Sequence, residues 1–171
     1  IRLKSKAEMI PPQSVYAAGT EADSHGFYFP FGEQLSVYEE VYFSCDEAFS
    51  KKGALITMSF LLDYTKIPLN ITEKEEINWR LIMPKSAVKV EPEYDVTISK
   101  VIWEYFNGTG WARLFEDSRY DSVFTPEQFT GRQKKTLRFT CPKDMSPAIV
   151  NSAEGRFIRA RIINLNNRFK T

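Results

Sequence analysis

Aromatic side chains crowd one segment of the chain in a pattern that could bind a sugar. Trp103, Tyr105 and Trp111 flank the loop Asn107–Gly110, which carries the Asn-Gly pair typical of a β-hairpin turn. Because exposed aromatic rings stack on the faces of sugar rings, these three side chains are candidate ligand-stacking residues. Cross-strand aromatics also stabilise hairpins and fill cores, and we expect that structural role here.

Arginines alternate with apolar residues near the end of the chain. Arg156, Arg159 and Arg161 are candidate partner-contact residues, because a guanidinium group presents a planar fork of donors to carboxylates or phosphates. In a strand, the arginines at 159 and 161 would lie on the face opposite the intervening apolar residues Ile158, Ala160 and Ile162. That arginine face is either a solvated outer surface or an interface with an acidic partner.

Carboxylate, histidine and cysteine residues show no catalytic or metal-binding spacing in the sequence. Glu116 and Asp117 are neighbours, so in a strand they point to opposite faces, whereas glycosidases need two carboxylates across one cleft. His25, the only histidine, lies in a polar stretch, and Cys45 and Cys141 are expected to be buried free thiols. We therefore predict a protein that is not an enzyme, with no catalytic, cofactor-binding or metal-binding residues.

The chain as a whole is nearly neutral and rich enough in apolar residues to form a core. Its 171 residues are 43% hydrophobic and 14% aromatic, and 23 basic and 22 acidic side chains leave a net charge of +1. This balance argues against nucleic-acid binding, which favours a surplus of basic residues. No apolar run reaches the roughly 18 residues of a membrane span, so we predict none.

Alternating apolar residues and turn signals predict a mostly β chain. The predicted strands cover residues 36–44, 54–64, 78–83, 96–106, 111–116, 135–141 and 155–163. Short helical turns are predicted at residues 45–53, ending at Gly53, and at 148–152. The pattern predicts a single antiparallel, jelly-roll-like β-sandwich over residues 27–171, preceded by an extended N-terminal arm or linker over residues 1–26.

Several segments occur in an order that is informative about family. The hairpin has the form W-x-Y-x-N-G-x-G-W-x-x-L from Trp103 to Leu114. Around it, in chain order, lie the segments Phe29–Gly32, Val41–Ala54, Thr136–Pro142 and Glu154–Ile162. This order resembles modules in baseplate proteins of contractile phage tails and related injection systems. The resemblance runs from about Phe27 to Ile163, with departures at Phe157, in place of Trp or Tyr, and at residues 118–122.

The resemblance implies a non-catalytic structural module whose partners are other baseplate subunits of the same particle. Such a protein would be made in the bacterial cytoplasm and would then sit in the baseplate of a phage, a prophage or a tail-like particle. Because the sequence begins with Ile1, we expect a piece of a larger protein. The alternative is a carbohydrate-binding module whose glycan stacks on the Trp103 and Trp111 hairpin.

Overall fold

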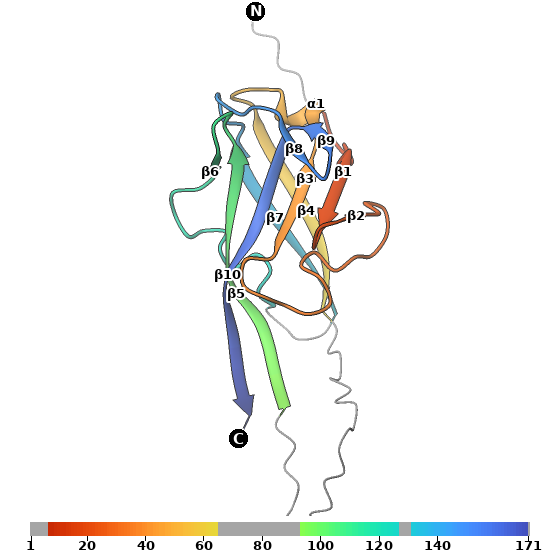
Figure 1. Ribbon diagram of the computed structural model, residues 1–171, viewed down its shortest axis with the longest axis vertical. Coiled ribbons are helices and arrows are strands. Elements are labelled where there is room, and N and C mark those ends of the chain that lie inside the picture. The colour runs from red at the N-terminus through yellow and green to blue at the C-terminus, as the bar shows by residue number, and fades with distance from the viewer. Residues whose placement is uncertain (1–6, 65–92, 127–130, 171) are drawn as a thin grey trace, which may run out of the picture.

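The computed structural model describes residues 7–64, 93–126 and 131–170, and these form a mostly β chain (Figure 1). The larger sheet is antiparallel, with six strands in the order β2-β1-β3-β10-β5-β6. Its strands, in chain order, are β1 (Ser14–Ala17), β2 (Thr20–Ala22), β3 (Glu40–Ser44), β5 (Glu93–Phe106), β6 (Trp111–Arg113) and β10 (Phe157–Lys170). The predicted mostly β, antiparallel fold is confirmed. Its jelly-roll-like connectivity stays a prediction, and the predicted strand at 78–83 lies outside the described residues.

Two long strands form a second layer, which crosses behind the main sheet in Figure 1. β4 (Leu55–Tyr64) and β7 (Gly131–Thr140) pair along their whole length in antiparallel register. The register places Ile56 opposite Phe139 and Met58 opposite Leu137. Because successive side chains on a strand point to opposite faces, both pairs lie on the same face. These four side chains face the main sheet and contribute to the core between the layers.

Aromatic rings join the two layers at the centre of the core. Trp103 of β5 packs against Phe43, Phe60 and Phe124, with ring centroids 6.3, 5.8 and 5.8 Å away. Phe31, from the loop before β3, meets Phe124 edge-on at 5.0 Å. Burial of one large apolar side chain contributes about 1.5–3 kcal/mol, so this cluster is a major source of the fold's stability.

Short elements close the ends of the layers. The predicted helical turn at 45–53 is present as α1 (Asp46–Phe49), and Gly53 follows it with φ +79°. The helical turn predicted at 148–152 is wrong, because that segment begins a hairpin of β8 (Ala148–Val150) and β9 (Ala153–Gly155). Asn151 and Ser152 both have positive φ, the geometry of a tight two-residue hairpin turn. In the described ranges, no helix has the length and apolar character needed to cross a bilayer.

The N-terminal segment belongs to the main sheet. Residues 1–26 were predicted to form an extended arm or linker, but β1 and β2 lie in this range and β1 pairs with β3. Val15, Tyr16 and Ala17 are buried, and Ala18 and Gly19 take positive φ to turn the chain back into β2. In the described part of this range, the chain therefore forms a hairpin that is anchored to β3 by an apolar triplet.

The two longest strands of the main sheet continue past their neighbours as a two-stranded extension (Figure 1). β3 pairs with β10 only from Phe157 to Arg161, whereas β5 pairs with β10 as far as Lys170. The register shifts around Asn164, as at a β-bulge, where the pair leaves the body of the sheet. We call this part, residues 93–98 with 165–170, the β5–β10 ribbon.

Candidate functional site

Two arginines and two glutamates form an ion network on the face of the main sheet that points away from the second layer. The register places Arg159 of β10 opposite Glu104 of β5, and Arg161 opposite Glu40 of β3. Arg159 donates from Nε to Glu104 Oε2 at 2.9 Å and from Nη1 to Glu40 Oε1 at 2.7 Å. Arg161 donates to both Glu104 oxygens, at 3.2 and 3.0 Å. One glutamate therefore joins two arginines.

The network is largely withdrawn from solvent. Only 7% of the Glu104 side chain and 12% of the Arg159 side chain are exposed. The hydrogen bond to Glu104 raises the pKa of Arg161, and burial followed by a bond to Glu40 raises the pKa of Tyr42. A buried charge is tolerated only when it is paired and hydrogen-bonded, and the mutual pairing of these side chains meets that condition.

Trp111 covers the network from above. The guanidinium carbon of Arg159 lies 4.3 Å from the centroid of the Trp111 ring, within the range of a cation–π contact. The same ring meets Tyr42 and Phe106 edge-on, with centroids 5.5 and 5.7 Å away. Tyr42 and Phe106 therefore fix the position of the indole, and the indole in turn holds the Arg159 side chain in place.

The three candidate partner-contact arginines do not form one free basic stripe. Arg159 and Arg161 are neutralised by glutamates from other strands. Arg156 lies apart from them, where its backbone N–H donates to Asp46 Oδ1 at 2.9 Å and its Nη1 lies 3.5 Å from the same oxygen. With so little of Arg159 exposed, that side chain braces the sheet rather than offering donors to a partner.

The three candidate ligand-stacking residues do not share a platform. Trp103 is in the core with 3% of its surface exposed, and its indole N–H donates to the Tyr120 carbonyl at 3.2 Å. Trp111 lies on the opposite face of the sheet, above Arg159. Tyr105 donates its hydroxyl to Asp144 Oδ1 at 3.1 Å. A sugar-binding platform needs exposed, coplanar rings, and this geometry instead places the aromatics in structural positions.

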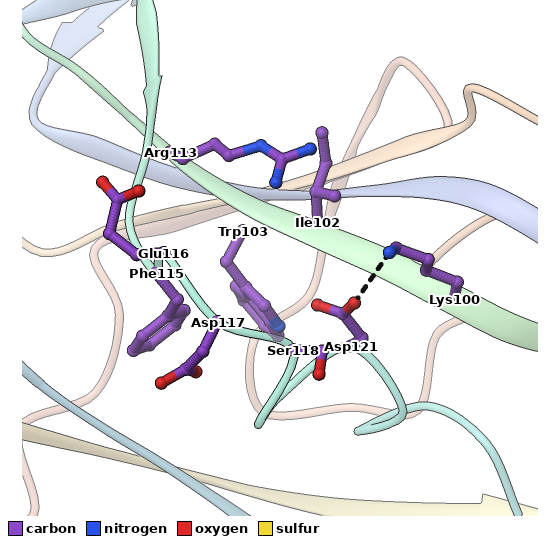
Figure 2. Close-up of a pocket in the computed structure, with 9 residues that line it drawn as sticks. All are labelled: Lys100, Ile102, Trp103, Arg113, Phe115, Glu116, Asp117, Ser118 and Asp121. Atoms are coloured by element: carbon purple, nitrogen blue, oxygen red, sulfur yellow. Dashed lines mark ion pairs between the residues drawn. The ribbon is translucent and has the colours of Figure 1, made fainter.

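A small hollow of about 120 Å³ lies beside the edge of β5, between that strand and the loop after β6. Figure 2 shows Lys100 and Asp121 facing each other on one side of it, where they form an ion pair of 3.1 Å. On the far side, Asp117 accepts hydrogen bonds from Arg119, and these bonds lower the pKa of Asp117. A general acid needs a raised pKa instead. The Asp117–Arg119 pair therefore suits bracing of the loop.

The side chains that could act as nucleophiles or metal ligands do not cluster in the described part of the chain. Cys45 and Cys141 are buried free thiols, as predicted, and burial raises the pKa of both. Within residues 7–64, 93–126 and 131–170, no three His, Cys, Asp or Glu side chains gather where they could hold a metal ion.

Sequence reasoning found the arginines but missed their partners. Glu40 and Glu104 are more than 60 positions apart in the sequence, and each is far from Arg159 along the chain. One signal was available: Glu104 interrupts the most apolar stretch of its strand, and a charge at such a position needs a partner.

No protein-family model matches the chain, and comparisons with characterised proteins and with solved structures find no significant match.

Proposed function

We propose that this chain is a non-catalytic structural module of the baseplate of a phage tail or tail-like particle, where it packs against other baseplate subunits. The observation that carries the proposal is the β5–β10 ribbon, which leaves the body of the sheet as a projecting pair of strands (Figure 1). A projecting ribbon offers backbone donors and acceptors along its outer edges. Such edges favour packing against another chain.

The pairing pattern defines those edges. β3 stops pairing with β10 at Arg161, and β6 pairs with β5 only between Glu104 and Phe106. From Ile98 and Leu165 outward, no other strand in the described part of the chain pairs with the ribbon. Unpaired strand edges are templates for β-strand addition by a partner, and an assembly protein can use them without any catalytic group.

The rigidity of the sheet below the ribbon also supports a structural role. The ion network ties three adjacent strands together through side chains, in addition to their backbone ladders. The sequence segments with the family resemblance also meet in space, since Phe31 and Trp103 pack on the same Phe124 ring and Ile158 lies opposite Tyr105. The resemblance therefore rests on residues that together build one body.

Carbohydrate binding is not proposed as a second function, because no observation favours it. The hypothesis depends on Trp103 and Trp111 stacking on one glycan, and the two rings lie on opposite faces of the main sheet. A buried indole cannot stack on a sugar without unfolding of the core.

Deletion of the module in the bacterium that encodes it tests the proposal. An in-frame deletion of these 171 residues is expected to leave tails without complete baseplates in negative-stain electron microscopy. Expression of the intact parent protein from a plasmid is the control and should restore normal particles. Complete baseplates in the deletion strain would contradict the structural role.

A further inference from the structure

The outer face of the second layer carries exposed side chains of a distinctive kind. Because β4 and β7 pair in strict register, one set of side chains points away from the core. We call this set the outer β4–β7 face: Leu55, Thr57, Ser59, Leu61 and Asp63 on β4, and Arg132, Lys134, Thr136, Arg138 and Thr140 on β7. It differs from the arginine-bearing face of the main sheet, because two of its four charged side chains form no ion pair within the described residues.

Two cations on this face are unneutralised within the described ranges. Arg132 is engaged, since its Nε lies 3.3 Å from Asp63 Oδ2 and its guanidinium lies over the Phe27 ring. Lys134 and Arg138 are both exposed, and no described residue forms an ion pair with either side chain. The face therefore has a net positive charge that is open to solvent.

The backbone beneath Arg138 is held firmly, although its side chain forms no ion pair within the described residues. The Tyr120 hydroxyl accepts from the Arg138 N–H at 3.2 Å and lies 3.3 Å from the Arg138 carbonyl oxygen, to which it donates. These contacts fix the edge of β7 at the position of the exposed guanidinium. A rigid strand presents a charged side chain at lower entropic cost than a loose loop does.

Exposed leucines lie on the same face as the free cations. Leu55 is 74% exposed and Leu61 is 61% exposed, and the register places Leu61 directly opposite Lys134. A single exposed leucine is ordinary on a protein surface. Leu55 and Leu61 lie about 20 Å apart along β4, and Arg138, opposite Thr57, and Lys134, opposite Leu61, complete an extended strip that is both apolar and basic.

We propose that the outer β4–β7 face docks an acidic protein surface, with carboxylates opposite Lys134 and Arg138 and apolar side chains over Leu55 and Leu61. Charge complementarity requires the partner surface to be negatively charged. The leucines favour a protein over a nucleic acid, because phosphates would leave them uncovered. This inference rests on the proposed function only in expecting that the partner is a neighbouring baseplate subunit.

Site-specific photo-crosslinking of the full parent protein in its own cells tests the inference. Thr136 lies at the centre of the face, so benzoylphenylalanine is introduced there and the adduct is mapped by mass spectrometry. The expected adduct is a protein segment rich in Asp and Glu. Lys134→Glu is expected to lower the adduct yield by about tenfold, equivalent to about 1.4 kcal/mol. Lys143→Glu makes the same charge change on an exposed lysine in the loop after β7 and should leave the yield unchanged.

The outcomes separate this inference from the proposed function. An adduct with nucleic acid, an adduct on a segment without acidic residues, no adduct, or an unchanged yield in Lys134→Glu would overturn the docking surface. If the chain is present in particles without such an adduct, the structural role stands and the docking surface fails. If an acidic, charge-dependent adduct forms while the chain is absent from particles, docking stands and the baseplate role fails.

Discussion

Glu104 is the residue on which the outer face of the main sheet depends most. It lies in a strand of mostly apolar residues, and its two carboxylate oxygens bind Arg159 and Arg161. Replacing one member of a buried charge group leaves the others unpaired, which costs more than the group contributes as a whole. Loss of this carboxylate is therefore expected to lower the free energy of unfolding more than loss of an exposed carboxylate does.

Glu104→Gln is expected to lower the free energy of unfolding by about 3 kcal/mol, because the network loses the more buried of its two counter-charges and only Glu40 is left to pair with Arg159 and Arg161. Urea denaturation at pH 7 measures the difference. Glu116→Gln, at an exposed position, is the matched control and should change the unfolding free energy by no more than about 0.5 kcal/mol. Equal effects of the two substitutions would show that the network does not stabilise the fold.

Residue types predicted part of this site. The alternation of Ile158, Arg159 and Ala160 indicated correctly which side chains face the core. The sequence did not reveal that Arg159 is neutralised, because its partners come from strands that are remote along the chain. The assignment of Trp103 and Trp111 to opposite faces likewise needed the register of the hairpin, since the motif alone places both beside one turn.

Among the elements, the β5–β6 hairpin was predictable because its turn residues have a distinctive sequence. Asn107 accepts hydrogen bonds from the Thr109 and Gly110 N–H groups, and Gly108 takes φ +96°. Asn-Gly signals this geometry clearly. The β8–β9 hairpin was missed because each of its strands has three residues, too few for alternation to be recognised. The strands β1 and β2, of four and three residues, were missed because they are also too short to show alternation.

Gly108→Ala is expected to destabilise the protein by about 1–2 kcal/mol, because the backbone is in the left-handed region. The new Cβ would also lie 3.2 Å from Ser146 Oγ. Thermal unfolding followed by circular dichroism should show a melting temperature lower by about 2–8 °C. Gly110→Ala is the control, since no atom lies within 4 Å of its added Cβ, and a loss as large in this variant would contradict the role of Gly108.

At the scale of the whole molecule, the order of the strands carries the functional argument. β10 is the last strand in the sequence and yet lies between β3 and β5 in the sheet. This non-local pairing generates both the ion network and the β5–β10 ribbon. Periodicity predicts a strand but not its neighbours, so the sequence supported an antiparallel β fold and could not anticipate a projecting ribbon.

The distribution of charge also follows from this arrangement. The chain is almost neutral overall, but the main sheet pairs Arg159 and Arg161 internally while the outer β4–β7 face leaves Lys134 and Arg138 open. The cations of β7 are therefore more open to an acidic partner than the arginines of β10 are. Two separate features, the ribbon edges and the basic face, are then exposed where a partner protein could bind.

Cryo-electron microscopy of purified wild-type particles tests the proposed structural role of the chain in a baseplate. We expect baseplate density that fits the two-layer body, with the β5–β10 ribbon in contact with a neighbouring subunit. Mass spectrometry of the same particles should detect the chain. Its absence from purified particles, or a baseplate map in which no density fits this body, would contradict the proposed role.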